Sequence, residues 1–123
     1  MPKIITVQNK NRPIPGTVRI KFCDTFLTQL RGFTFRSGIA QDEGLVLAGT
    51  RDTRLDSSIH MLFVPFDLSV IWINSAMQVV DKVLAKAWRP AYFSKVPARY
   101  VLEIHPERWR DFEIGDGVEF RDG

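Results

Sequence analysis

Two short apolar segments in the middle of the chain constrain its fold more than any other feature. Ser58–Val64 and Leu68–Ile73 carry apolar side chains at odd and even positions alike, so strands formed there would be covered on both faces. Asp67 and Asn74 interrupt the longest apolar run, which stays below the roughly 20 residues needed to span a bilayer. We therefore expect the middle of the chain to be the interior of a sheet in a protein without a membrane span.

Further short strands are predicted on both sides of this centre. Alternating or apolar runs place them at Lys3–Gln8, Thr17–Phe22, Leu45–Ala48, Met77–Ala87 and Arg99–Ile104, and a closing strand ends near Phe120. One short helix is expected after Asp24, which can cap it, with Gly32 as its stop, and another after Pro106. Many short strands with little helix predict a mainly β fold: a compact, antiparallel, barrel-like or sandwich-like single domain over residues 1–123.

Aromatic side chains supply much of the surface that such a domain can bury. The 123 residues are 45% hydrophobic and include nine Phe and three Trp. Trp72, Trp88 and Trp109 could line an apolar pocket, but Trp in strands more often belongs to the core. We expect them to pack in the interior.

Cysteine usage and the first residues indicate the compartment. Cys23 is the single cysteine and cannot form an intramolecular disulfide, and the start Met1–Thr6 lacks the apolar core of a secretory signal. The sequence therefore predicts a cytoplasmic protein.

The charge of the chain is distributed unevenly. Residues 1–54 carry nine Lys and Arg against four Asp and Glu, a net +5, whereas residues 55–123 carry eight against ten, a net −2. The cations of the first half stand singly rather than in clusters, and a nucleic-acid footprint needs several on one face. The sequence thus disfavours nucleic acid as a partner.

His60 lies inside the apolar segment Ser58–Val64, and its role is open. A buried imidazole must hydrogen-bond at least one ring nitrogen or lose about 1–3 kcal/mol. Asp67, Ser58 and Asp56 are candidate partners. The sequence favours a histidine of the core or rim over a catalytic base or ligand.

Catalytic and metal-binding alternatives use the few other reactive side chains. Cys23 could pair with His60 in a hydrolase or transferase, the imidazole activating the thiolate. A zinc site from Cys23, His60, His105 and one carboxylate lacks the close ligand spacing of known sites. We expect no cofactor and no metal.

Arg31 and Arg36 are five residues apart near the expected helix end. Arg31 can bond the last helix carbonyls, and Arg36 can pair with Asp42 or Glu43. Alternatively, both guanidinium groups converge on a carboxylate or phosphate of a ligand. The polar stretch Thr50–Ser57 could rim such a site.

Three blocks of the sequence resemble a bacterial and archaeal family known as domain of unknown function 192. They are Arg31–Arg36, Ser58–His60 with the aromatic run that follows, and Ala98–Glu103 with Gly115–Asp116, and the similarity extends over about residues 22–120. The resemblance implies a small single-domain β fold and no established enzymatic activity.

The chain departs from the family pattern at two places. Asp67 and Ser69 stand where the family tends to have Pro and Asp, so a role of that family aspartate does not transfer. Met77 stands where the family hairpin usually has Gly, and Met resists a positive φ. We expect a turn of a different type there.

These observations favour a non-catalytic binding or accessory module for a small anionic ligand or a protein partner. Its candidate ligand-binding residues are Arg31, Arg36, His60 and Asp67. A hydrolase or transferase using Cys23 or His60 is the first alternative, and weak nucleic-acid binding is the second.

Overall fold

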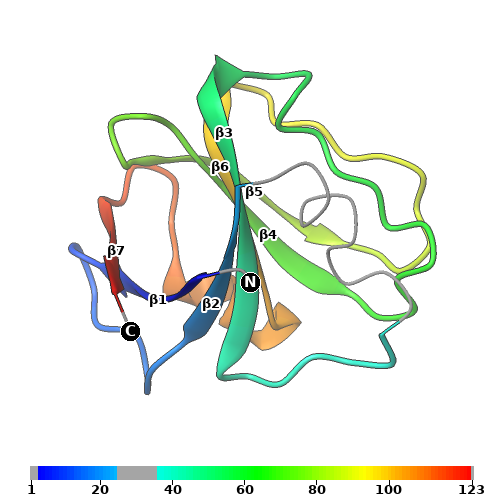
Figure 1. The fold of residues 1–123 in the computed structure, drawn as a ribbon, viewed down its shortest axis with the longest axis horizontal. Coiled ribbons are helices and arrows are strands. Elements are labelled where there is room, and N and C mark those ends of the chain that lie inside the picture. Colours follow the sequence, from blue (N-terminus) through cyan, green and yellow to red (C-terminus); the bar gives the residue numbers. More distant parts are fainter. Residues whose placement is uncertain (1–2, 25–35, 123) are drawn as a thin grey trace.

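The computed structural model describes residues 3–24 and 36–122. One mixed sheet of seven strands dominates this part of the chain, in the order β5-β4-β6-β3-β2-β1-β7 (Figure 1). The elements are β1 (Lys3–Asn9), β2 (Arg19–Cys23), β3 (Glu43–Thr53), β4 (Leu68–Ile73), β5 (Val79–Ala85), β6 (Ala98–Ile104), the 3₁₀ helix η1 (Pro106–Asp111) and β7 (Val118–Asp122). The mainly β fold predicted from the sequence is confirmed.

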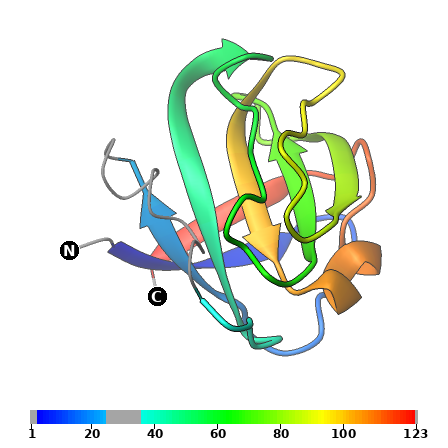
Figure 2. The same cartoon turned by 90° about the vertical axis from the view of Figure 1, so that its right-hand side faces the viewer.

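The sheet is antiparallel except where β2 and β3 run parallel, with Ile20 opposite Gly44 and Cys23 opposite Leu47. It curls until its two edges meet at one end, where Val79 N–H donates to Asp116 O (2.8 Å) and Val118 N–H donates to Met77 O (2.8 Å). Figure 2 shows the curl from the side, with the long β3 arching across it. The sheet is not closed into a continuous barrel, because these bonds join the edges only at that end.

Both faces of the sheet bury apolar side chains. One face, inside the curl, packs Ile20, Val46, Ile71, Leu102 and Phe112 among its buried residues. The other face carries a second buried cluster, which we call the outer cluster: Cys23, Leu45, Ile59, Met61, Val64, Leu68, Val70, Trp72, Ala85, Ala98 and Val101. Burial on both sides explains why all six residues of β4 are buried, as its sequence predicts.

The segment 54–67 contributes to the outer cluster without forming the strand expected at Ser58–Val64. Its extended pairing is limited to a single bridge between Ile59 and Tyr92, and a turn follows in which Val64 N–H donates to Met61 O (3.1 Å). The prediction of a strand was wrong because an apolar segment lying across a sheet face has the same composition as a buried strand. His60 is consequently exposed rather than in the core.

Two aromatic residues of the loops over the outer cluster adopt backbone conformations that are rare for their type. Phe63 (φ 62°) and Trp88 (φ 66°) are both left-handed, and their rings meet edge to face at 5.7 Å between centroids. Trp88 is 52% exposed, unlike the fully buried Trp72. The expectation that the tryptophans lie in the interior thus holds for Trp72 and fails for Trp88.

Met77 in the β4–β5 turn has a positive φ (62°), so the expectation that a Met resists this conformation was wrong. A turn type different from that of the family stays a prediction. Asn74 explains how a Met tolerates this conformation. Its Oδ1 accepts from Ala76 N–H and Gln78 N–H, both at 3.0 Å, while Met77 N–H donates to Asn74 O (3.0 Å). These bonds, together with the packing of Met77 against the buried residues inside the curl of the sheet, offset roughly 1–2 kcal/mol of backbone strain.

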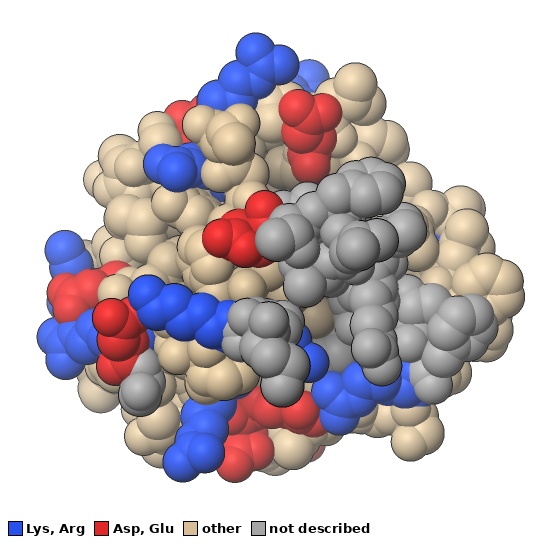
Figure 3. All heavy atoms as spheres, viewed as in Figure 1, with Lys and Arg blue, Asp and Glu red and all other residues tan. Residues whose placement is uncertain are grey.

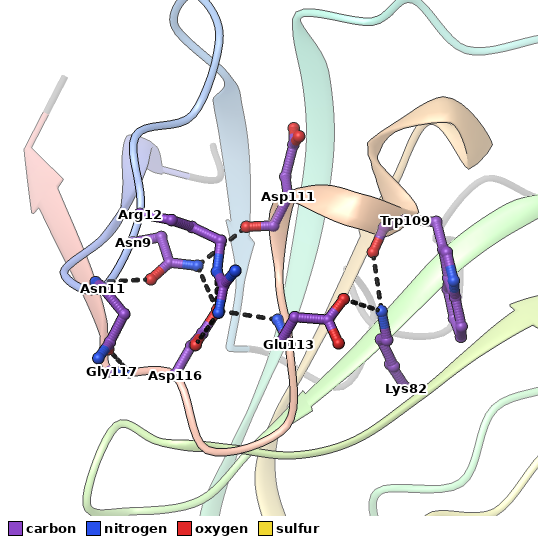
Figure 4. Close-up of polar contacts among 9 residues, drawn as sticks. All are labelled: Asn9, Asn11, Arg12, Lys82, Trp109, Asp111, Glu113, Asp116 and Gly117. Atoms are coloured by element: carbon purple, nitrogen blue, oxygen red, sulfur yellow. Dashed lines mark hydrogen bonds and ion pairs between the residues drawn. The ribbon is translucent and has the colours of Figure 1, made fainter.

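A polar network closes the end where the sheet edges meet (Figure 4). Asp116, 4% exposed, accepts two hydrogen bonds from Arg12 (2.7 and 2.8 Å), one from Asn9 (2.8 Å) and one from Glu113 N–H (2.8 Å). The bonds from Arg12, more than any other cause, hold the pKa of Asp116 well below its ordinary value. The turn at Gly115–Asp116 therefore connects the β1–β2 loop, through Arg12, to the start of β7.

The short helix predicted after Pro106 is confirmed as η1. His105 caps it, since its Nδ1 accepts from Glu107 N–H (3.1 Å). The helix expected between Asp24 and Gly32 lies outside the described residues. Within residues 3–24 and 36–122, no helix is long and apolar enough to cross a membrane.

Candidate functional site

A break in the pairing of β3 with β6 creates the main candidate site. Ala48 pairs with Tyr100, but the next pair joins Thr53 to Ala98. Between these two pairs, β3 advances by five residues while β6 advances by two. Such a register shift is typical of a β-bulge, and bulges are common beside binding sites. The site is therefore built where the sheet stops being regular.

A cleft of about 410 Å³ lies at this break, and we call it the β3–β6 cleft. Its described lining comes from the ends of β2, β3 and β6 and from the loop after β3: Asp24, Ala48, Gly49, Thr50, Arg51, Thr53, Asp56, Ser57, Ala98 and Arg99. In Figure 3, acidic and basic side chains both appear on the upper part of the molecule, over the end of β3. The volume falls in the range of small-molecule sites.

Arg99 is the most constrained charge of the cleft. It is half-buried, its Nε donates to Gly49 O at 3.0 Å, and its guanidinium carbon lies 5.0 Å from the centre of the Tyr100 ring. Gly49 permits the close approach of the two backbones, because a Cβ at this position would lie 3.0 Å from Arg99 O. Among the described residues, Gly49 O is the one acceptor of a hydrogen bond from this guanidinium.

The loop after β3 is held in place by its own hydrogen bonds. Ser57 Oγ donates to Thr53 O (2.6 Å), Asp56 N–H donates to Thr53 Oγ1 (3.4 Å), and Trp72 Nε1 donates to Ser57 O (2.8 Å). Asp52 adds a tether to the β4–β5 turn by accepting from Ser75 N–H and Oγ, both at 2.8 Å. Five residues of the stretch Thr50–Ser57, which the sequence suggests could rim a site, line the cleft.

The residues that the sequence singled out for ligand binding do not meet in this cleft. Arg31 lies outside the described residues. Arg36 forms a two-bond ion pair with Glu43 (2.9 and 3.2 Å) at the start of β3, the opposite end from the cleft, and this pair confirms the structural alternative for Arg36. A ligand role for Arg31 or Arg36 stays a prediction.

His60 and Asp67 also lie outside the described lining. None of the predicted partners of His60, which are Asp67, Ser58 and Asp56, bonds its ring. Asp67 instead accepts from Ala87 N–H (2.9 Å) and Lys86 Nζ (3.4 Å), and the bond from Ala87 is the main reason its pKa is lowered. Asp67 thereby ties the start of β4 to the chain after β5, and a ligand role for either residue stays a prediction.

The reactive alternatives receive no assembled site among the described residues. Cys23 is buried in the outer cluster, His60 is exposed, and His105 caps η1. No three His, Cys, Asp or Glu side chains of residues 3–24 and 36–122 gather as metal ligands would.

Glu103 is a buried ionisable residue outside the described lining of the cleft, and its sequence motif did not mark it as a candidate. It is 7% exposed, and its register neighbours Leu45 and Val70 both belong to the outer cluster. Burial raises its pKa to about 8, so the carboxyl is largely protonated at neutral pH. The signal was present in the sequence as a lone acid inside the apolar strand of residues 100–104.

Comparisons with known proteins agree with this fold. The model of the family DUF192, described as an uncharacterized ACR, matches residues 5–121. A UPF0127 protein of Thermococcus gammatolerans is 37% identical over 119 residues, covering 95% of this chain and 74% of its own. The UPF0127 protein TK1120 of Thermococcus kodakarensis is 36% identical over 80% of this chain, which spans 61% of that relative's length.

Two solved structures share the fold at low sequence identity. A protein of unknown function from Novosphingobium aromaticivorans has a TM-score of 0.79 and 21% identity, covering 94% of this chain and 83% of its own. A putative transcription regulator from Sinorhizobium meliloti has the same TM-score and 14% identity, covering 98% and 94%. With the family match over most of its length, the chain belongs to the DUF192 family.

Proposed function

We propose that this protein is a non-catalytic binding module that holds a small ligand with an anionic group in the β3–β6 cleft. The observation that carries the proposal is Arg99, a half-buried guanidinium whose Nε is fixed on Gly49 O and whose outer N–H groups meet no described acceptor. Arg51 adds a second guanidinium to the same lining.

The chemistry of these groups favours a carboxylate or phosphate. A guanidinium offers planar pairs of N–H donors that match the two oxygens of such anions. Because Arg99 is already oriented by Gly49 O and the Tyr100 ring, less side-chain entropy is lost when a ligand binds. The proposal does not depend on Arg31, Arg36, His60 or Asp67.

The proposal is tested by calorimetric titration with a panel of small carboxylates, phosphate esters and amino acids. At least one member should bind, and Arg99→Gln should weaken that member at least tenfold. Arg51→Gln tests the same site without disturbing the Gly49 bond and should also weaken binding. Arg110→Gln, an exposed arginine of η1, is the matched control and should bind like the parent protein.

Two results would contradict the proposal. One is that no anion of the panel binds. The other is equal affinity in Arg99→Gln and the parent, with thermal unfolding confirming that the variant is folded.

A further inference from the structure

The β3–β6 cleft carries charges of both signs. Arg51 and Arg99 line it together with Asp24 and Asp56. Elsewhere in the described residues, seven ion pairs form, from Lys3 with Asp122 to Arg121 with Glu119. None of the four cleft charges takes part in an ion pair within residues 3–24 and 36–122, although all four lie around one small space.

These opposite charges come from different elements of the fold. Arg99 is held by Gly49 O and by the Tyr100 ring, on the β6 side. The backbone of Asp56 belongs to the hydrogen-bonded turn from Thr53 to Ser57, in the loop after β3. Asp24 directly follows β2, whose last residue Cys23 is opposite Leu47 of β3. Arg99 is therefore fixed through its side chain, whereas the exposed Asp24, Arg51 and Asp56 are placed around the cleft by their backbone.

This arrangement disfavours ligands that carry one sign of charge only. A plain anion attracted by Arg99 and Arg51 would also bring its charge near two carboxylates, and a plain cation would meet two guanidinium groups. A molecule with both an anionic and a cationic group can satisfy all four side chains at once. Each of its charged groups loses water on binding, and a side chain of opposite charge offsets that cost at either end.

The volume limits the size of such a molecule. About 410 Å³ suits a small metabolite and excludes a folded partner or a nucleic-acid strand from the interior of the cleft. We infer that the ligand is a small zwitterion, of the size of a free amino acid or short peptide, with its anionic group on Arg99 and Arg51 and its ammonium group on Asp56 and Asp24. This inference rests on the proposed function of the cleft.

A matched set of ligands tests the inference by calorimetry. Each free amino acid and dipeptide of the panel is compared with its N-acetyl form, which keeps only the anion, and with its C-terminal amide, which keeps only the cation. The best free compound should bind at least tenfold more tightly than either derivative.

Variants assign each end of the ligand. Asp56→Asn should remove the preference for the free compound over its N-acetyl form, and Arg99→Gln should remove the preference over the amide. Glu107→Gln, an exposed carboxyl of η1, should leave both preferences unchanged.

The outcomes separate the two proposals. If an N-acetyl or other purely anionic compound binds as tightly as the free zwitterion, the inference fails while the proposed anion-binding function stands. If only amides bind, or nothing in the panel binds, both fail.

Discussion

Glu103 places an ionisable group among apolar neighbours, since Leu45 and Val70 flank it on the face of the outer cluster. No described residue donates a hydrogen bond or a positive charge to its carboxylate. Burial therefore raises its pKa to about 8 from an ordinary 4.5. The folded protein holds this proton over a pH range in which the unfolded chain releases it.

The free energy of unfolding should consequently fall as the pH rises. Below about pH 4.5 the carboxyl is protonated in both states and costs nothing, whereas between pH 4.5 and 8 the unfolded state is favoured by ionisation. At about 1.4 kcal/mol for each unit, the loss is on the order of 3–5 kcal/mol. Glu103→Gln should flatten this decline and be more stable than the parent at pH 8, measured by urea unfolding at pH 5, 6.5 and 8.

Glu107→Gln on the exposed face of η1 is the control and should keep the parent's decline. Parallel pH profiles for Glu103→Gln and the parent would refute the assignment. Asp116 has the opposite pH dependence. Because its pKa is lowered in the folded protein, its contribution to the free energy of unfolding is complete above the ordinary pKa of an aspartate and is lost as the pH falls through the lowered pKa.

Among the elements, β3 depends on a residue without a side chain. Gly44 lies between Ile20 of β2 and Ile104 of β6, and a Cβ there would come within 2.7 Å of Glu103 O, 2.8 Å of Ile104 Cγ2 and 2.9 Å of Ile20 Cδ1. The first of these is backbone and cannot rotate away. The close packing of three strands at this point thus requires glycine.

Gly44→Ala should lower the free energy of unfolding by roughly 1–3 kcal/mol, because an added methyl group in a packed core forces its neighbours apart. Gly38→Ala is the matched control, since nothing lies within 4 Å of its Cβ position, and its effect should be within about 0.5 kcal/mol. Urea unfolding of both variants gives the comparison, and equal midpoints would mean that β3 can shift to admit the methyl group.

Across the whole molecule, Arg108 connects parts of the chain that are far apart in sequence. It is 8% exposed and donates to Gln41 O before β3, to Pro15 O in the β1–β2 loop (3.1 Å) and to Asp111 in its own helix (2.8 Å). One side chain therefore fixes η1 against two loops at the end of the sheet.

Arg108→Met should reduce the free energy of unfolding by roughly 1–3 kcal/mol, because Asp111 loses its ion-pair partner and the carbonyls of Gln41 and Pro15 each lose a donor. Arg110→Met, an exposed neighbour in the same helix, should change it by less than about 0.5 kcal/mol. Thermal and urea unfolding measure both. A loss in Arg108→Met no larger than that in Arg110→Met would show that η1 does not need this anchor.

At this scale the sequence by itself determined where β4 and β6 lie and that the fold is mainly β. A segment with apolar residues on both faces must lie inside a packed protein, as a strand or as a buried connection. Turn-forming residues separate these segments along the chain. The ion pair of Arg36 with Glu43 was also predictable, since the two are seven residues apart and flank a turn.

Only the tertiary structure decided that His60 is exposed and that Arg99, Asp56 and Asp24 surround one cleft. Local sequence cannot distinguish a buried strand from a loop crossing a sheet face, because both need inward apolar residues. The cleft exists because β3 and β6 lose their register between Ala48 and Thr53. Register depends on pairing between distant segments, which no short stretch of sequence encodes.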